Sequence, residues 1–401
     1  VQTSGGATRN SIEDPAGPVY VNIRSVTISG YYGHCNTGDD ALAATVAWGV
    51  VQYLRPKTLN IACRKDLVLP KGLSARFLQP SNWARVEALK RKVQADCHLL
   101  GGGSVLHDQY GAWPLLKRLA LLKAGQTFGC RTAAIGVSVG PVDRWLSKRV
   151  LRRLLSQMAF IGIRDEQSLE TVQSICGESP ENVTLMMDPA VLIERIGLPE
   201  PAVAPRPEKP TIVVAPCDRE RIAVGDERRD QVRRDRLSEC LNKVLRNCRC
   251  RIRLLVMNGS PAVGDERTCQ IIAASLPAGS VEIIPYNENP LFAFRVIQQA
   301  DLVLGMRLHS LIYAYTASVP FIALNYHRKI IDFVRVAAGS RAEVVDCTDF
   351  DPTGLAKCIL ETLETGGADL GTRLPLIEAQ ARVLAGFENL GLRLGSVTAG
   401  H

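Results

Sequence analysis

Short runs of β-branched and apolar residues alternate with longer segments of helical period along most of the chain. In the first such unit, residues 19–29 predict a buried strand, residues 30–38 a glycine-rich turn, and residues 39–54 a helix whose Leu42 and Val46 are one helical turn apart. Further strands are expected at Thr58–Cys63, Cys97–Leu100, Thr132–Val137, Phe160–Ile163 and Val183–Met186, with helices between most of them. Strands that alternate with helices indicate an α/β fold with a mostly parallel sheet.

The alternation stops at residues 196–210, which contain five prolines and no apolar period. Such a composition is typical of a linker. Beyond it the same alternation begins again. Strands are expected at Thr211–Ala215, Ile252–Val256, Val281–Ile284 and Leu302–Leu304, and helices at Arg228–Cys248, Asp265–Leu276, Leu291–Gln299 and Arg373–Leu390. The chain therefore divides into two halves of the same architecture.

A chain of 401 residues is long enough for two or three domains. We expect an α/β fold of two doubly wound, Rossmann-like domains that face each other across a cleft, with ligands beyond the carboxyl ends of the strands. The expected divisions are a disordered leader at 1–18, an N-terminal domain at 19–195, the linker at 196–210, a C-terminal domain at 211–370, and a last helix within 371–401 that can cross back to the first domain.

The composition excludes several classes of protein. A hydrophobic share of 46%, with 33 Gly and 22 Pro, is ordinary for a globular chain and argues against a disordered or fibrous protein. The net charge of +8 favours anionic ligands or an acidic membrane face, but it is too diffuse to predict nucleic-acid binding. The longest stretch without charge, 311–326, contains Pro320 and is too short to cross a bilayer.

The twelve cysteines are scattered singly through apolar segments, which favours a reducing, cytoplasmic location. The close pair Cys248 and Cys250 has no second pair at a spacing that would complete a zinc site, so we expect no metal. Residues 1–17 have no apolar core and do not resemble a signal peptide. The expected location is the cytoplasm, with peripheral contact at the inner membrane face as the alternative.

A glycine-rich turn at residues 30–40, GYYGHCNTGDD, joins the first predicted strand to the first helix. Glycines let the backbone approach a ligand, and the helix start offers N–H groups to an anion or to sugar hydroxyls. Gly30, Tyr31, Asn36 and Asp39 are therefore candidate binding residues. The alternative is a plain tight turn in which Asp39 caps the helix, and the two interpretations are compatible.

Two more glycine-rich segments follow predicted strands. Gly102 and Gly103 belong to a run of three glycines directly after the strand that is expected to end at residue 100, which favours a ligand-facing loop. His107 and Gln109 follow this run, and a packing role is as consistent with His107 as a binding role. Ser138 belongs to the third segment, GVSVGP, and is a further binding candidate.

Two arginines also stand at predicted strand ends. Arg164 precedes a helix, where its charge either binds a ligand or solvates the helix. Arg307 and His309 lie just before the most apolar helix of the chain, where a charge is costly unless it is paired. An arginine fork suits phosphate or carboxylate, and a histidine suits proton transfer near neutral pH. Lys329 lies in a basic segment after the next strand.

Residues 114–123 and 144–155 each predict a helix with an apolar face beside basic residues. The simpler interpretation is a helix that faces the core and carries solvated charges. The alternative is contact with a membrane surface through Arg149, Arg152 and Arg153.

These motifs, in this order, resemble the polysaccharide pyruvyl transferase family. The resemblance runs from GYYGHCNTGDDAL through GGGSVLHD, AIGVSVGP, GIRDEQS and DPA to GMRLHSLIYAYTASVPFIALNYHRKI, or roughly residues 19–334. The family is similar in fold to two-domain glycosyltransferases of the GT-B type. The resemblance implies transfer of a pyruvyl group from phosphoenolpyruvate to two hydroxyls of a sugar in a polysaccharide or lipid-linked precursor, with release of phosphate. Phosphoenolpyruvate is then the donor substrate, and no further cofactor is expected.

The resemblance also implies roles for residues at the matching positions. Arg164 and Arg307 are similar to the residues that clamp the phosphoenolpyruvate anion. Leu308 belongs to the same motif as a substrate-binding position, and His309 is similar in position to the family's candidate general acid.

Two assignments rest on weaker grounds. Asp39 and Glu166 are our choices for the catalytic base, since each is a carboxylate beside a candidate motif. The segment 325–329, NYHRK, stands where the family more usually has S-Y-D-P-K, so an acid is missing there and the role of Lys329 is left open.

Two other functions fit the same residues. A GT-B glycosyltransferase would use Arg307 and His309 to hold the diphosphate of a nucleotide sugar, and a non-catalytic glycan-binding protein would keep the fold without turnover. The sequence does not name the acceptor sugar, because its choice depends on the loops around Tyr31, His107 and Gln109.

Overall fold

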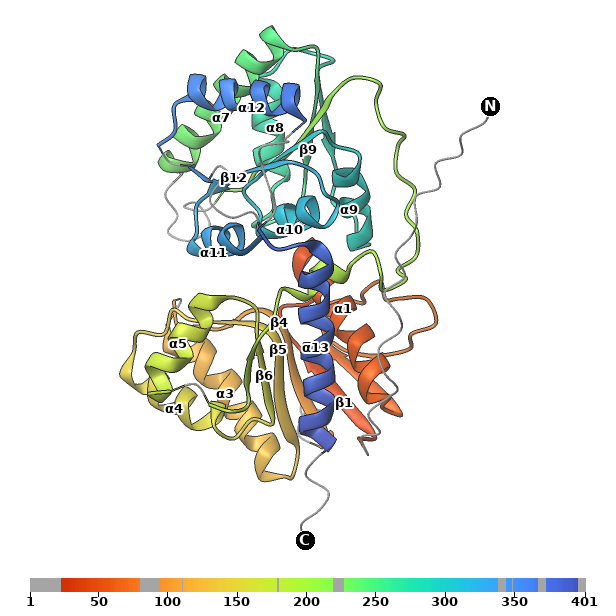
Figure 1. The fold of residues 1–401 in the computed structure, drawn as a ribbon, viewed down its shortest axis with the longest axis vertical. Coiled ribbons are helices and arrows are strands. Elements are labelled where there is room, and N and C mark those ends of the chain that lie inside the picture. The colour runs from red at the N-terminus through yellow and green to blue at the C-terminus, as the bar shows by residue number, and fades with distance from the viewer. Residues whose placement is uncertain are drawn as a thin grey trace.

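The computed structural model describes residues 23–79, 94–109, 111–178, 180–218, 227–337, 344–347, 349–366 and 373–395. Within this part of the chain, two parallel β-sheets are each covered by helices (Figure 1). The strands of the first sheet are β1 (Ser25–Ser29), β2 (Thr58–Ala62), β3 (Arg76–Leu78), β4 (Cys97–Leu106), β5 (Arg131–Val139), β6 (Phe160–Ile163) and β7 (Val183–Leu185). Those of the second are β8 (Thr211–Ala215), β9 (Arg251–Leu255), β10 (Val281–Ile284), β11 (Leu302–Gly305), β12 (Phe321–Asn325) and β13 (Val344–Asp346). We call the units built on them the N-terminal and C-terminal domains.

Both sheets have the strand order of a doubly wound fold. The first sheet runs β3-β2-β1-β4-β5-β6-β7 and the second β10-β9-β8-β11-β12-β13. In each, the chain moves outward from a central pair of strands and then reverses, at β1 and β4 in one sheet and at β8 and β11 in the other. Ligands of such sheets bind beyond the carboxyl ends of the strands at this reversal. The expected class of two Rossmann-like α/β domains is confirmed.

Helices cover both faces of the first sheet. On one face lie α3 (Ala112–Thr127), α4 (Trp145–Leu155) and α5 (Glu166–Cys176), and on the other lie α1 (Thr37–Leu54), the short 3-10 helix η1 (Pro189–Leu192) and α13 (Leu376–Gly395). Figure 1 shows α13, the last helix of the chain, along the strands of the N-terminal domain, where it contacts α1, β5 and β6. The described helices of the C-terminal domain are α7 (Arg228–Asn247), α8 (Glu266–Ala274), α9 (Pro290–Gln298), α10 (Leu308–Thr316), α11 (Arg328–Ala337) and α12 (Pro352–Thr365).

Helix α1 joins the two domains because it is buried on nearly all sides. It packs on β4 and α13 within the N-terminal domain and on α9 and α10 of the C-terminal domain. Its first turn is also bonded across the interface: Thr37 N donates to Met257 O at 3.0 Å, and Tyr286 Oη donates to Asp40 Oδ2 at 3.2 Å. One apolar core is therefore continuous through the interface and fixes the first turn of α1 against the other domain.

The structure corrects one predicted boundary. The strand that was expected to end at Leu100 continues as β4 to Leu106, so Gly102 and Gly103 lie within a strand and not in a loop. Both have positive φ, +72° and +82°, and a Cβ at Gly102 would press on Leu42 of α1. Glycine there lets the strand bend past the helix. The leader predicted at 1–18 lies outside the described residues.

Candidate active site

Charged side chains gather where the carboxyl ends of the two sheets face each other. Arg164 follows β6, Arg307 follows β11, and Lys329 lies in the first turn of α11, just after β12. Lys329 interacts electrostatically with both arginines and with Asp39 in the first turn of α1. His309, in the first turn of α10, interacts with Arg164 and Lys329. The structure thus brings together five of the residues that the sequence indicated.

Arg164 is buried, and hydrogen bonds within the N-terminal domain hold its guanidinium. Its Nε donates to Ser138 Oγ at 2.7 Å, and its Nη2 donates to Ser104 Oγ at 3.2 Å. Nη1 donates to Asp188 Oδ2 at 2.6 Å. Asp188 is itself fixed at the start of η1, where Oδ1 accepts from Ala190 N at 2.9 Å. Two of the three partners of Arg164 are neutral hydroxyls. An anionic ligand can take the place of these hydroxyls, while Asp188 continues to pair with the Arg164 charge.

Arg307 is held side-on by a carboxylate of its own domain. Its Nε donates to Asp265 Oδ2 at 3.1 Å and its Nη2 donates to Asp265 Oδ1, which fixes the plane of the guanidinium. Asp265 is completely buried, and its Oδ2 also accepts from Asn258 N at 2.9 Å. Burial lowers the pKa of Arg307, but Asp265 outweighs this effect and the pKa lies well above the ordinary value. Arg307 is a permanent positive charge in a fixed orientation.

His309 lies at the contact between the domains. Gly38, in the first turn of α1, stands directly against its ring, so that a Cβ at position 38 would overlap the imidazole. Nε2 lies 3.9 Å from Asp188 Oδ2 and makes no hydrogen bond to a described residue. Burial lowers the pKa of His309 to about 4, while Asp188 raises it and Arg164 and Lys329 lower it. His309 is therefore neutral at neutral pH.

Asp39 has the opposite protonation behaviour. Its Oδ2 accepts a hydrogen bond from Asn36 Nδ2 at 2.6 Å. Burial, followed by the charge of Asp40, raises the pKa of Asp39 to about 7, although the three nearby cations lower it. Much of Asp39 thus holds a proton at neutral pH. The sequence prediction made His309 the acid and Asp39 a candidate base, whereas the pKa order favours the reverse.

Lys329 adds a third positive charge beside the two arginines. Burial, followed by Arg164 and Arg307, lowers the pKa of Lys329 to about 8, and Asp39 raises it. Most of Lys329 is still charged at neutral pH. Asp188 and Asp265 already pair with the two arginines, so Lys329 supplies the excess positive charge of the cluster, and the three cations together favour an anionic ligand.

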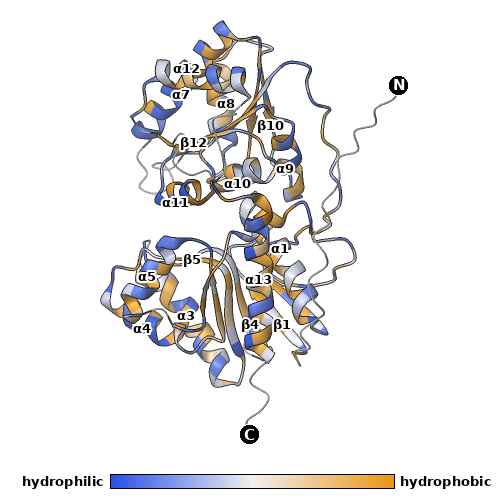
Figure 2. Ribbon diagram, in the orientation of Figure 1, coloured by the Kyte–Doolittle hydropathy of each residue, from blue (hydrophilic) through white to orange (hydrophobic). Residues whose placement is uncertain are grey.

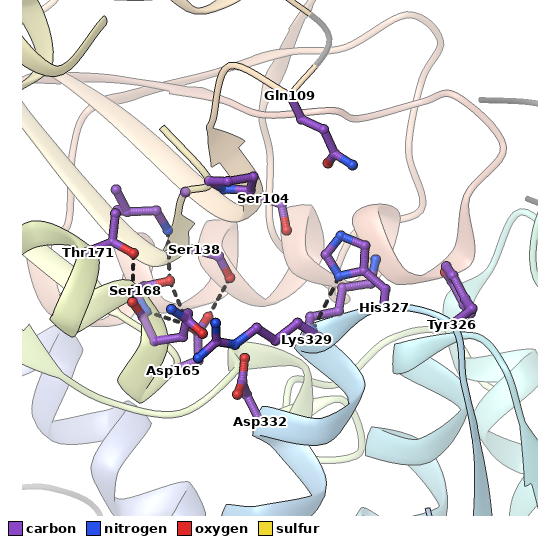
Figure 3. Close-up of a pocket in the computed structure, with 15 residues that line it drawn as sticks. Ser104, Gln109, Ser138, Asp165, Ser168, Thr171, Tyr326, His327, Lys329 and Asp332 are labelled. Carbon is purple, nitrogen blue, oxygen red and sulfur yellow. Dashed lines mark hydrogen bonds between the residues drawn. The ribbon is translucent and has the colours of Figure 1, made fainter. Parts of the chain in front are cut away.

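A pocket of about 320 Å³ opens beside Lys329, between the two domains. Figure 3 shows the side chains around it: Ser104, Gln109 and Ser138 come from the N-terminal domain, and His327, Lys329 and Asp332 come from the C-terminal domain. Hydroxyl, amide and carboxylate groups in a cleft suit a ligand with many hydroxyls. The pocket lies beside the cation cluster, so two ligands can be held next to each other.

The remaining predicted residues of the glycine-rich turn make contacts within the N-terminal domain. Gly30 lies against the ring of Tyr32. Tyr31 is half exposed, and its ring stacks on His34 with 4.0 Å between centroids. The side chain of Asn36 caps α1 by accepting from Gly38 N at 3.3 Å. The cap interpretation therefore applies to Asn36, and Asp39 faces the charged cluster.

Other candidates lie around the cluster at varying distances. Gly103 stands beside Asp39, since a Cβ there would lie 3.4 Å from Asp39 Oδ1. Leu308 is buried and lines a smaller hollow that also includes Arg164 and Lys329. His107 is partly buried, which lowers its pKa; Arg118 and, to a lesser degree, Lys329 also lower it, while Asp108 raises it. These residues shape the site without adding charge to it.

Glu166 is not brought into the cluster. It is exposed at the start of α5 and lines a separate hollow together with Arg335, Arg373, Glu378 and Arg382. Although it is only two positions from Arg164, the turn between β6 and α5 directs the two side chains to different places. The structure therefore gives no support to Glu166 as the base.

Sequence reasoning missed three carboxylates. Asp188 belongs to the DPA motif at a strand end, and this position was a usable signal. Asp332 lines the pocket one helical turn after Lys329, where its own pKa is raised by burial and then by Asp165. It supplies an acid near the place where the NYHRK segment lacks one. Asp265 gave no local signal, because only the fold brings it to Arg307.

No helix among the described residues is both long and apolar enough to span a membrane. Within the same residues, no group of three or more His, Cys, Asp or Glu side chains is placed to hold a metal ion.

A sequence model of the family described as polysaccharide pyruvyl transferase matches residues 36–328, well over half of the chain. The chain belongs to this family. The matched region of this polysaccharide pyruvyl transferase family member includes Asp39, Arg164, Asp188, Arg307 and His309, and Lys329 is the first residue beyond it. The resemblance seen in the sequence motifs is confirmed. No curated protein sequence matches the chain.

Solved structures with a similar fold share little sequence with this pyruvyl transferase family member. MnaA of S. aureus, solved with UDP, is 10% identical with a TM-score of 0.61, over 92% of this chain and 94% of that one. UDP-GlcNAc 2-epimerase from Methanocaldococcus jannaschii is 11% identical with a TM-score of 0.57, over 90% and 99%. Alr3699/HepE of Anabaena, in complex with UDP-glucose, is 11% identical with a TM-score of 0.52, over 92% and 97%. These likenesses show the GT-B type of fold alone.

Proposed function

We propose that this protein transfers a pyruvyl group from phosphoenolpyruvate to two hydroxyls of a sugar, forming a cyclic ketal and releasing phosphate. The observation that supports the proposal is the meeting of Arg164, Arg307 and Lys329 around Asp39, with His309 beside Arg164 and Lys329. Phosphoenolpyruvate carries a carboxylate and a phosphate, or about three negative charges at neutral pH. Arginine forks suit both anionic groups, and Lys329 adds a positive charge beside the two arginines, which already pair with Asp188 and Asp265.

In the proposed first step, a sugar hydroxyl attacks the carbon of phosphoenolpyruvate that bears the phosphate. Asp39 gives its proton to the neighbouring methylene carbon, which becomes a methyl group, and neutral His309 takes the proton of the hydroxyl. The pKa values support this division, since Asp39 at about 7 still holds a proton near neutral pH and His309 at about 4 is unprotonated and free to accept one.

In the proposed second step, the bond between the same carbon and the phosphate oxygen breaks. His309, now protonated, gives its proton to the phosphate, and the three cations stabilise the leaving charge. Asp39, now ionised, takes the proton of the second hydroxyl, whose oxygen bonds to the carbon and closes the ketal. Both side chains return to their starting states, so that atoms and protons balance over the cycle.

The acceptor sugar is proposed to bind in the pocket of Figure 3. Its wall of Ser104, Gln109 and Ser138 faces Asp332 across the opening, and Lys329 lies at the boundary with the cation cluster. This places hydroxyl-binding groups next to the anion site, as a reaction between a sugar and phosphoenolpyruvate requires. A sugar within a polysaccharide or a lipid-linked precursor is the acceptor that we expect, in the cytoplasm.

The donor can be tested before the acceptor is known. Isothermal titration calorimetry of the full chain should detect phosphoenolpyruvate binding, and Arg307→Ala should weaken it at least tenfold while circular dichroism stays unchanged. Phosphate release is then measured on a panel of galactose-, mannose-, glucose- and hexosamine-containing oligosaccharides, with mass spectrometry of the product. Phosphate release that needs both phosphoenolpyruvate and glycan, with a ketal in the product, supports the proposal.

Other results of the same assay favour the alternative functions. Turnover of a nucleotide sugar, with no use of phosphoenolpyruvate, would indicate a glycosyltransferase. Glycan binding that is unchanged in Arg307→Ala and His309→Ala, with no turnover of either donor, would indicate a non-catalytic binding protein.

A further inference from the structure

The surplus of positive charge is concentrated in one part of the chain. Residues 110–163 contain nine Lys and Arg residues and one acid, Asp143, so that their net charge equals the +8 of the whole chain. The rest of the sequence is neutral in sum. The charge that looked diffuse in the overall composition is therefore a property of the segment that forms α3, β5 and α4.

The exposed side of these two helices also carries large apolar side chains. Trp113 is 66% exposed, Phe128 74%, Trp145 73% and Leu146 41%. They are four of the ten large apolar residues that are exposed in the described part of the chain. Exposed tryptophans are costly in water and are typical of surfaces that meet an apolar or interfacial environment.

Basic residues lie between and beside these apolar side chains. On α4, Lys148, Arg149, Arg152 and Arg153 are exposed, while the opposite side of the helix is buried in the domain. On α3, the Lys117 ammonium lies over the Trp113 ring at 5.1 Å. Helices α3 and α4 pack against each other, and Figure 2 shows hydrophilic and hydrophobic residues alternating along both. We call the exposed side of the two helices the α3–α4 face.

The α3–α4 face begins at the mouth of the pocket. Trp113 and Trp145 lie in the first turns of their helices, at the carboxyl edge of the sheet. Each tryptophan is four residues after a pocket-lining residue, Gln109 in one case and Pro141 in the other. A surface that receives this face therefore lies next to the opening of the pocket.

We infer that the α3–α4 face binds the surface of an anionic lipid bilayer, with Trp113 and Trp145 at the headgroup level and the arginines of α4 against the lipid phosphates. Basic residues combined with tryptophan and leucine on one helical face match an interfacial contact. A second copy of the chain is a poorer partner, because it would bring the same positive face against itself. Glu178, which lines a hollow beside Arg149, Arg152 and Arg153, does not balance their charge.

The test is co-sedimentation of the full chain with phosphatidylcholine vesicles, with and without phosphatidylglycerol. We expect binding only to vesicles that contain phosphatidylglycerol, and loss of that binding in high salt. The triple variant Arg149→Glu, Arg152→Glu, Arg153→Glu should lower the vesicle partition coefficient about a hundredfold. The double variant Trp113→Ser, Trp145→Ser should lower it without changing the net charge.

A matched control carries the same charge change on the other domain. Arg229, Arg246 and Arg249 are exposed in the C-terminal domain, and their replacement by Glu should leave vesicle binding nearly unchanged. Circular dichroism checks that every variant is folded. Phosphoenolpyruvate binding checks that the cation cluster, which does not include residues of this face, is unchanged. The inference stands apart from the proposed reaction, because vesicle binding needs no substrate.

Four outcomes would overturn the inference. The first is failure of the wild-type chain to bind phosphatidylglycerol vesicles. The second is equal loss of binding in the control triple variant, which would mean that net charge alone matters. The third is that the face binds a single-stranded oligonucleotide more strongly than vesicles. The fourth is that the tryptophan variant converts a dimer to a monomer without affecting vesicle binding.

Discussion

Gly38, in the first turn of α1, lies directly against the imidazole of His309, in the first turn of α10. The two helices belong to different domains, and hydrogen bonds between the domains hold the start of α1 in place. The position of His309 therefore depends on a residue without a side chain in the other domain. The sequence pattern assigns this glycine to ligand approach, and in the structure it makes room for His309, the proposed catalytic histidine.

Gly38→Ala is expected to lower kcat about a hundredfold, because the added methyl group displaces the imidazole. Stability should fall slightly, because relieving the overlap with the buried imidazole costs about 1–3 kcal/mol, whereas Ala favours a helix over Gly by only about 1 kcal/mol. Gly354→Ala is the control, as Gly354 lies in the first turn of α12, where a Cβ would only approach Asp351 Oδ2 at 3.3 Å. Full activity of Gly38→Ala would show that catalysis does not need His309 where it now lies.

The pH dependence of kcat/KM should be bell-shaped. Activity should rise through pH of about 4 as His309 loses its proton and fall through about 7 as Asp39 loses its own. The phosphate of the substrate also titrates, near about 6. The profile of Asp39→Asn separates the titration of the substrate phosphate from that of Asp39. The fall in activity near pH of about 7 should disappear from the residual activity of this variant, because it belongs to Asp39, whereas the effect of the phosphate should remain. If the upper limb persists in Asp39→Asn, another group donates the proton.

Asp39→Asn should also change how stability depends on pH. The pKa of Asp39 is 3.8 in the unfolded chain and about 7 when folded, so the folded state binds the extra proton between these values. Asp39 therefore makes its full contribution to stability when the pH is below 3.8, its pKa in the unfolded chain. That contribution is lost as the pH rises through about 7, its pKa in the folded chain. Asp39→Asn should be more stable than the wild type by about 4 kcal/mol above pH of about 7. Urea unfolding at several pH values measures this, and equal stability at every pH would contradict the raised pKa.

Glu166→Gln should keep activity within about a factor of two, because exposed side chains away from the site rarely matter. Glu166 lines a hollow with Arg335 and Arg382, apart from the cation cluster. Steady-state rates of Glu166→Gln and Asp39→Asn, measured side by side, separate the two carboxylates that the sequence offered as the base. A large loss in Glu166→Gln with an intact fold would move the reaction to that hollow.

The sequence predicted the sheets well because buried parallel strands are continuous apolar runs. It placed β2, β6 and β8 within a residue or so of their observed bounds. It could not distinguish a glycine loop from a bent strand at Gly102 and Gly103, since both need the same residue type. The difference depends on Leu42, which a helix 60 positions earlier brings against the strand.

A site residue could be predicted from the sequence where a single local motif both contains the residue and places it at the end of a strand. Arg307 and His309 stand two apart at a strand end, and the turn that follows β11 places both at the domain contact. The carboxylates that hold the two arginines come from elsewhere in the chain: Asp188, which precedes η1, pairs with Arg164, and Asp265, at the start of α8, pairs with Arg307. Local patterns carry no information about which distant carboxylate meets which arginine, and they gave no pKa for His309.

Asp265→Asn tests whether Arg307 meets the anion of the donor. The change keeps the shape of the side chain but leaves Arg307, which is only 19% exposed, without its negative partner. We expect the free energy of unfolding to fall by about 3 kcal/mol, as for other broken buried pairs. Phosphoenolpyruvate can supply the missing negative charge, so the rise in Tm that it causes should be larger in Asp265→Asn than in the wild type.

Thermal unfolding with and without phosphoenolpyruvate measures both effects. Asp349→Asn is the matched control, since its pair with Arg236 is largely exposed and such pairs contribute at most about 1 kcal/mol. That variant should show the wild-type response to phosphoenolpyruvate. If Asp265→Asn shows the same response as the control, the anion does not reach the Arg307 guanidinium. The donor would then be held by Arg164 and Lys329 alone, and Arg307 would be a structural partner of Asp265.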